Sequence, residues 1–282
     1  MSYNNFIPTV WSAKLQRERE RDAVAIMLCN RDWEGDIKDV GDTVKINGVI
    51  RPTVGQYVKN TTTITPQNLN GASTELKIER ADYFAFEVDD VDKRQASGDI
   101  MDAQLKEANE AMSDSADDYI YSKYTDVPAA NTVDCANLTS ATTISKIIDG
   151  VTILWDNKVP KKAEISLEAS PKFLAKMLMA ELITGMPNDN AMRNGYVGRL
   201  KDYLGVKVYM SNGVYNDDTY DYCFLRTKAA IAFADQLNKI EAYRPESAFS
   251  DAIKGLHLYG AKIVRPKEIV ILRASYAAET TI

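Results

Sequence analysis

The sequence contains a single histidine, His257, and only three cysteines, Cys29, Cys135 and Cys223, which lie far apart. A Ser–His–Asp or Cys–His catalytic group would have to use His257, which lies in a strand-like stretch where a packed or paired histidine is expected. No CxxC pair and no Cys/His spacing typical of a zinc site occurs, so neither a disulfide framework nor structural zinc is expected. We therefore expect free thiols, no catalytic residue, no bound metal and no cofactor.

Long apolar runs and an excess of positive charge are also missing. The longest helical apolar run, residues 23–29, is far shorter than the ~20 residues of a membrane-spanning helix. No basic segment followed by an apolar segment opens the chain, so we expect no signal peptide and no membrane partner. The 34 Lys and Arg residues against 40 Asp and Glu give a net charge of −6, which disfavours strong non-specific binding to DNA phosphates.

Sequence motifs of known enzymes are absent or weak. There is no nucleophile elbow, P-loop, HExxH or kinase signature. GYVG at 195–198 has the spacing of a GxxG RNA clamp, but a turn entering a strand is the expected structure in an acidic chain. DDTYD at 217–221 supplies three carboxylates without the glycine spacing of a calcium loop, and we expect a solvated turn.

The stretch YFAFEVDDVDKRQA at 83–96 is the strongest candidate for chemistry. It contains four carboxylates within six residues: Glu87, Asp89, Asp90 and Asp92. One interpretation is a metal-dependent enzyme that uses this cluster. The other is the start of a helix, where Asp92 and Gln95 have the spacing of a capping box and carboxylates favour the positive end of the helix dipole. We prefer the helix start.

Hydrophobic periodicity predicts an α+β fold with at least two layers. The predicted helices are 12–29, 92–124, 142–157 and 170–183, the last with Ser170 as its cap and Pro171 at its first position. The predicted strands are 42–46, 73–79, 83–88, 163–168, 205–211, 221–228, 253–264 and 268–275. Residues 125–142 are expected to be a polar connection, and 229–237 are not assigned firmly to either class.

Two features of this pattern indicate an elongated molecule that is ordered partly by contacts outside itself. The helix predicted over 92–124 could reach about 50 Å, longer than a compact chain of this size accommodates easily. Residues 51–72 are rich in Thr, Asn, Gly and Pro and contain too few large apolar residues for a core of their own. They form either a flexible loop or a β-arm that packs against something else.

Three stretches of the chain, in this order, resemble the major capsid protein of tailed bacteriophages, which has the Hong Kong 97-like fold. The first is TTTITPQNL at 61–69 followed by ELKIERADYFAFEVDDVDKRQA at 75–96, similar to an extended loop that returns to a spine helix. The second is RNGYVGRLKDYLGVKVYMSN at 193–212, and the third is KIEAYRPESAFSDAIKGLHLYGAKIVRPKEIVIL at 239–272. The resemblance covers nearly the whole chain.

The resemblance implies a division of the chain into an N-terminal arm, an extended loop, a peripheral domain with the spine helix, an axial domain, and closing strands of the peripheral domain. The corresponding residues are 1–40, 41–91, 92–136, 137–247 and 248–282. The extended loop would lie across a neighbouring subunit, with contacts from Val54, Tyr57, Val58, Lys59 and Ile64. The spine helix would start near Asp89, Asp90, Asp92 and Gln95.

As a function, the resemblance implies a structural protein that assembles with itself, as hexamers and pentamers, into an icosahedral head enclosing double-stranded DNA without sequence-specific contacts. Because the sequence opens directly on the arm, a separate scaffolding protein is expected, together with a portal. The chain would be found in the virion capsid and, during assembly, in the cytoplasm of the host bacterium. The resemblance also implies that Lys59 could form an isopeptide cross-link with an Asn in the C-terminal strands of another subunit. Residues 255–275 contain no Asn, so non-covalent assembly is expected. An encapsulin-like compartment shell is the alternative of the same fold.

Overall fold

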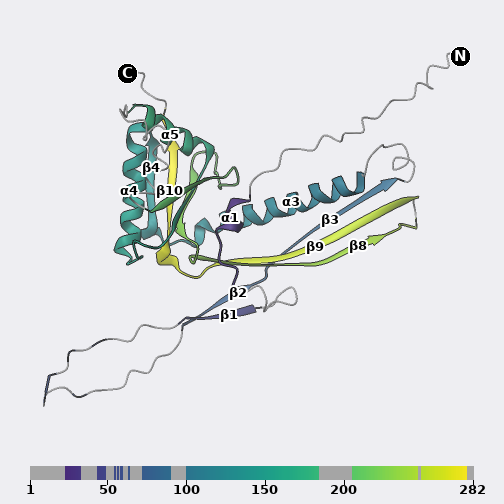
Figure 1. Ribbon diagram of the computed structural model, residues 1–282, viewed down its shortest axis with the longest axis horizontal. Helices are drawn as coiled ribbons and strands as arrows, with labels where there is room; N and C mark the ends of the chain where they lie inside the picture. The colour runs from purple at the N-terminus through teal and green to yellow at the C-terminus, as the bar shows by residue number, and fades with distance from the viewer. Residues whose placement is uncertain are drawn as a thin grey trace.

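The computed structural model describes most of the chain beyond residue 22. The described residues are 23–32, 43–48, 54, 56, 58, 59, 63, 72–89, 100–183, 205–246 and 249–277. A five-stranded sheet with its helices forms a body at one end, and a three-stranded sheet with a long helix extends away from it (Figure 1). A two-stranded ribbon leaves the region where the two parts meet. The α+β class and the elongated shape expected from the sequence are both confirmed.

The five-stranded sheet of the body combines strands that lie far apart in the sequence. In spatial order the strands are β4 (Thr132–Leu138), β10 (Ile269–Tyr276), β7 (Asp221–Thr227), β5 (Ile165–Ala169) and β6 (Val206–Met210). β10 is parallel to β4 and antiparallel to β7, whereas β5 is antiparallel to β7 and parallel to β6. All residues of β5 are buried, as expected for a strand with both faces covered.

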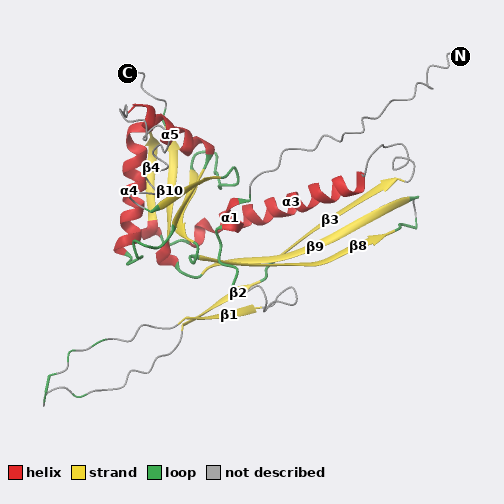
Figure 2. Ribbon diagram, in the orientation of Figure 1, coloured by secondary structure: helices red, strands yellow, loops and turns green. Residues whose placement is uncertain are grey.

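Helix α4 (Ser140–Asp156) packs closely on this sheet, beside α5 (Pro171–Ile183) (Figure 2). A Cβ added at Gly150 would lie 2.9 Å from a methyl group of Leu225 and 3.0 Å from one of Leu272, so the helix approaches the strands closely enough that a larger residue would displace these side chains. The buried residues Ile147, Val151 and Leu154 continue this contact along α4. The spacing that predicted a helix over 142–157 is therefore the spacing of its buried face.

The start of α5 follows the sequence-based prediction. The Ser170 hydroxyl accepts the backbone N–H of Phe173 at 3.2 Å, so Ser170 caps the helix. Pro171 occupies the first helical position, where a missing N–H costs nothing. Both parts of the prediction are confirmed.

The extended part of the molecule is an antiparallel sheet with one long helix beside it. Its strands, in spatial order, are β3 (Arg80–Asp89), β9 (Ser250–Ile263) and β8 (Ile231–Tyr243). Helix α3 (Ile100–Ser122) runs along β3 and β9 and has 23 residues, a length of about 35 Å. Met112, Ala116 and Tyr119, spaced four and three residues apart, form an apolar stripe on one side of α3 and are buried. The first part of the predicted helix, residues 92–99, lies outside the described residues.

The remaining elements are the ribbon and a short helix. β1 (Thr43–Gly48) and β2 (Ala72–Lys77) pair as an antiparallel ribbon that points away from both sheets (Figure 1). Of the helix predicted over 12–29, the structure describes residues 23–29, and Val24–Met27 among them form helix α1. Among the helices that the structure describes, none is both long and apolar enough to cross a membrane.

One sequence-based assignment of secondary structure needs correction, and one undecided segment can now be assigned. Residues 132–138 were expected to belong to a polar connection but form the edge strand β4, in which Val133, Cys135 and Leu138 are buried. An edge strand with one solvated face carries many polar residues, which hides it in the sequence. Residues 229–237, which were not firmly assigned, contribute to β8.

The axial and peripheral domains implied by the resemblance stay a prediction, but the sheets do not separate at residue 247. β8, which lies before this position, pairs with β9, which follows it. β10, among the expected closing strands, lies between β4 and β7 in the body. The strands of 248–282 are therefore shared between the two sheets.

Candidate inter-subunit surfaces

The residues predicted to contact other copies of the chain lie in the sequence between β1 and β2. The side chain of Val54 is 88% exposed and that of Val58 is 51% exposed. Lys59 is exposed as well. The other two predicted contacts, Tyr57 and Ile64, lie outside the described residues. The apolar side chains that can be placed thus face solvent in the single chain, and what they contact in an assembly remains a prediction.

The base of the ribbon, in contrast, is fixed to the long sheet. Leu76 of β2 is fully buried and Ile78, which follows the strand, is nearly so. They belong to a small apolar cluster with residues of β1, β8 and β9: Ile46, Ala232, Ala234 and Leu258. Because this cluster belongs to the chain itself, the base sets the direction in which the ribbon leaves.

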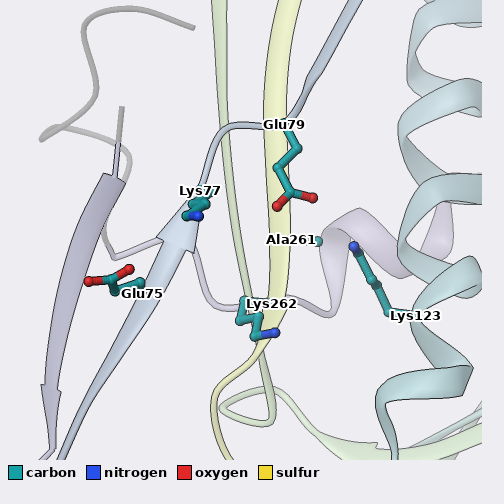
Figure 3. A pocket seen from close by; sticks show the side chains of 6 residues that line it. All are labelled: Glu75, Lys77, Glu79, Lys123, Ala261 and Lys262. Atoms are coloured by element: carbon teal, nitrogen blue, oxygen red, sulfur yellow. The ribbon is translucent and has the colours of Figure 1, made fainter. Parts of the chain in front are cut away.

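A charged pocket of about 520 Å³ lies beside the ribbon base (Figure 3). Its lining residues come from the ribbon, from β9 and from the turn after α3: Glu75, Lys77, Glu79, Lys123, Ala261 and Lys262. The Lys123 ammonium also lies 4.5 Å from the centroid of the Tyr119 ring, a cation–π contact. Side chains of both charges surround the pocket, so it fits a polar surface better than an apolar ligand.

A second pocket, of about 490 Å³, lies on the long sheet and is largely apolar. Its lining residues come from all three strands: Tyr83, Phe84, Ala85, Glu241, Lys254, Gly255 and Leu256. Tyr83 is 79% exposed, and the only charges of the lining form the Glu241–Lys254 ion pair at 3.0 Å. We call this surface, with Tyr243 beside Lys254, the outer face of the long sheet. A largely apolar pocket with an exposed aromatic side chain at its edge can accept an apolar side chain of another protein.

The acidic cluster that the sequence singled out is only partly described. Glu87 and Asp89 lie exposed on β3, and Glu87 accepts a hydrogen bond from Ser250 at 3.4 Å. Asp90, Asp92 and Gln95 lie outside the described residues, so the capping box stays a prediction. Within the described part of the chain, no group of three or more His, Cys, Asp and Glu side chains is arranged to hold a metal ion.

His257 lies under α3 in a polar cluster rather than in an open site. Its Nε2 is 3.4 Å from Asp235, and its ring lies 4.9 Å from that of Tyr259. Ser115 of α3 donates a hydrogen bond of 2.6 Å to Asp82, and the Tyr259 hydroxyl donates another to the same oxygen. The prediction that His257 is a packed and paired residue is confirmed.

The DDTYD stretch divides into a turn and a buried carboxylate. Asp217 accepts the N–H groups of Thr219 and Tyr220, as expected for a solvated turn. Asp221, however, is 4% exposed and accepts hydrogen bonds from the hydroxyls of Ser170 and Tyr276, both at 2.5 Å. The expectation of a solvated turn is therefore wrong for Asp221, which joins β7 to α5 and β10. The GYVG stretch lies outside the described residues.

Solved structures with the same arrangement come from phages. A structure from Mycobacterium phage Che8 is 26% identical, with a TM-score of 0.77 over 96% of this chain and 98% of that chain. The capsid structure of the cyanophage P-SCSP1u is 12% identical, with a TM-score of 0.73 over 96% and 94% of the two chains. The chain has the fold of a phage capsid protein.

The same fold also occurs in an encapsulin complex. An encapsulin complex from Synechococcus elongatus is 12% identical, with a TM-score of 0.64 over 97% of this chain and 94% of that chain. No protein-family model matches the sequence, and none of the curated proteins matches it. The similarity to these proteins is therefore much clearer in the fold than in the amino-acid sequence.

The sequence did not reveal the exposed apolar surface on the outer face of the long sheet. Side-chain alternation in YFAFEV places Phe84, Phe86 and Val88 on one face and Tyr83 on the other, in agreement with the burial along β3. The signal was therefore present in Tyr83, an aromatic residue on the polar side of a predicted strand. Its partners Lys254 and Leu256 come from β9, about 170 residues later in the chain, and pairing over that separation cannot be read from alternation.

Proposed function

We propose that this chain is the major capsid protein of a tailed bacteriophage, of which many copies form the icosahedral head shell around double-stranded DNA. The observation that carries the proposal is the match to a phage structure over 96% of this chain at a TM-score of 0.77. The copies associate as hexamers and pentamers, with a separate scaffolding protein and a portal as partners. Assembly takes place in the cytoplasm of the host bacterium and involves no catalytic residue.

The ribbon supports association between copies. Its base is buried in its own chain, while Val54 and Val58, between β1 and β2 in the sequence, are exposed. The outer face of the long sheet, around Tyr83 and Leu256, offers an apolar surface on a second copy. Burial of these side chains contributes ~25 cal/mol per Å² of apolar surface, less the cost of ordering. Because each copy makes several such contacts, weak interfaces add up to a stable shell.

The charge of the chain suits an enclosing role. Each copy carries a net charge of −6, so the inner surface of the shell does not bind DNA phosphates strongly. DNA can therefore be packed inside without being held by the shell. This supports contact with DNA that is general rather than sequence-specific.

An encapsulin-like shell is the second candidate, supported by the encapsulin structure of TM-score 0.64. The two functions differ in what is enclosed. Genes for a portal, a terminase and a scaffolding protein beside the gene for this chain support the phage head, whereas a neighbouring gene for a cargo enzyme supports the compartment.

The proposal is tested by expressing the chain with its genomic neighbours and examining the product by electron microscopy and sedimentation. We expect shells or capsomers from the wild type and from Val54→Ile, which keeps an apolar β-branched side chain. Val54→Asp is expected to leave a folded monomer that does not assemble, because residue 54 is exposed in the single chain. Monomers alone, under all conditions and with all partners, would overturn the proposal.

A further inference from the structure

Helix α1 is held from both ends by charged side chains of the protein interior. Near its start, the backbone N–H of Ile26 donates to Asp117 of α3 at 3.2 Å. Near its end, Arg226 of β7 donates to the carbonyl oxygen of Leu28 at 2.7 Å and to that of Ala25 at 3.1 Å. Asp117 and Arg226 are both fully buried. A segment of four helical residues is thus tied to α3 and to the sheet of the body at once.

Arg226 can hold the α1 segment while buried because its positive charge is paired with the carboxylate of Glu168. Its Nε donates to Glu168 of β5 at 2.6 Å, and both side chains are fully buried. Burial disfavours the guanidinium charge, but the adjacent Glu168 outweighs burial, so the pKa of Arg226 is raised above its usual value. The guanidinium therefore stays charged while its other nitrogens bind the two carbonyl groups of the α1 segment.

Directly after α1, the chain pairs with the first residues of the long sheet. Asn30 donates its N–H to Ile231 and accepts the N–H of Phe233, both at 2.9 Å. Arg31 then forms an ion pair of 2.5 Å with Asp235. Within eight residues, the chain contacts the body through Arg226 of β7 and the extended part through α3 and β8.

We propose that residues 24–31 are a locking segment that fixes the orientation of the long sheet relative to the body, with Arg226 as its positioning residue. The inference goes beyond the proposed function, since it concerns the single chain and holds whether or not copies assemble. It also places these residues in the folded core, although the resemblance assigns 1–40 to an N-terminal arm.

The lock is strong because its release leaves buried polar groups behind. If residues 24–31 detached, Arg226 would lose both carbonyl acceptors while remaining in the interior next to Glu168. A buried donor without a partner is strongly unfavourable. Release of the segment is therefore coupled to loosening of β7, where Arg226 lies, and of β8, which Asn30 holds.

Hydrogen exchange on the full-length chain tests the proposal with a matched pair of variants. Arg226→Lys keeps the charge beside Glu168, but one ammonium group cannot reach both carbonyls. We expect the amides of Leu28, Asn30 and Phe233 to exchange at least about tenfold faster, with those of α4 unchanged. Arg265→Lys alters an arginine of the same body whose side chain is 59% exposed, and no amide should change.

Two results contradict the lock. One is unchanged exchange at Asn30 and Phe233 in Arg226→Lys, and the other is an equal increase throughout α4 and β10, which indicates general destabilisation.

If Arg226→Lys does not fold, the double variant Glu168→Met/Arg226→Met removes both buried charges together and leaves neither unpaired. Its small-angle scattering should fit a range of angles between body and sheet, where the wild type fits one. A single angle in the double variant also overturns the proposal.

Discussion

Gly260 of β9 lies directly against the backbone of Lys77 at the base of the ribbon. A Cβ at position 260 would overlap the carbonyl oxygen of Lys77 and lie 3.0 Å from its carbonyl carbon and 3.2 Å from the Cα of Ile78. The close approach lets Leu76 and Ile78 enter the apolar cluster with Leu258. The ribbon is therefore positioned by contact between two backbones, which only a glycine permits.

Gly260→Ala is expected to displace the ribbon base. A backbone cannot turn aside as a side chain can, so β2 must move away from β9 and uncover the apolar cluster. We expect a loss of about 2–4 kcal/mol in the free energy of unfolding, in the range of a disrupted core contact, and loss of assembly. Denaturant unfolding of the monomer and sedimentation of the assembled product measure the two effects.

Gly255→Ala supplies the comparison for this prediction. The added Cβ would overlap the ring of Phe84, which is a side chain and can be shortened. Phe84→Leu should therefore restore much of the stability lost in Gly255→Ala, whereas no side-chain substitution should restore Gly260→Ala. An unchanged stability in Gly260→Ala would show that the ribbon base is not held by this contact.

The sequence predicted the class of fold and most of its elements because their periodicity reports local burial. The apolar stripe of α3 and the Ser170 cap of α5 depend on residues within one or two turns of each other. β4 was missed because its alternation involves Val133 and Cys135 among polar residues, a weak signal over a short strand. The pairing of β10 between β4 and β7 joins segments more than 40 residues apart, and no local pattern specifies it.

The candidate surfaces were only partly accessible to the same reasoning. The shortage of apolar residues in 51–72 predicts a segment without its own core, and of its residues that the structure describes, Val54 and Val58 are exposed. The sequence could not show that Arg226 would be buried beside Glu168 and bound to the backbone near residue 26. An arginine is ordinarily a surface residue, and its burial depends on an acid 58 residues earlier in the chain.

The three cysteines are expected to be unreactive in the native chain. Cys29, Cys135 and Cys223 are free and buried. Burial raises the pKa of Cys29 and Cys135 to about 11 and that of Cys223 to about 12, so almost no thiolate exists at neutral pH. A thiol-specific colour reagent should detect no thiol in the native monomer at pH 8 and all three after denaturation. Rapid reaction of one thiol in the native chain would contradict this packing.

Asn131 is expected to hold the turn before β10 through its side-chain amide. Its Nδ2 donates to the carbonyl oxygen of Pro266 at 2.7 Å and to that of Ile269 at 3.0 Å, and the residue is 6% exposed. Asn131→Asp replaces this donor with a charge that faces two acceptors, and we expect a loss of about 2–4 kcal/mol in denaturant unfolding. The same substitution at the exposed Asn137 should change stability by less than about 0.5 kcal/mol. Equal effects at both positions would refute this role.

Asp82 is expected to make the stability of the long sheet depend on pH in the acid range. Burial raises the pKa of Asp82, but hydrogen bonds from Ser115 and Tyr259 outweigh burial, so this pKa lies below its usual value. A carboxyl group with a lower pKa in the folded state than in the unfolded state stabilises the fold above the unfolded pKa, about 4. This contribution is lost as the pH falls through the lower, folded pKa.

Tyr259→Phe tests this pH dependence by removing one of the two donors to Asp82. The pKa of Asp82 should then rise toward its usual value. The free energy of unfolding of this variant should therefore fall by less between pH 5 and pH 2.5 than that of the wild type. Asp82→Asn should remove that contribution altogether, while Glu164→Gln, at an exposed carboxylate of the body, serves as the control. Thermal unfolding of the monomer across this range gives the measurement. If Asp82→Asn loses stability toward acid as steeply as the wild type does, the dependence arises from other carboxylates and the assignment to Asp82 is wrong.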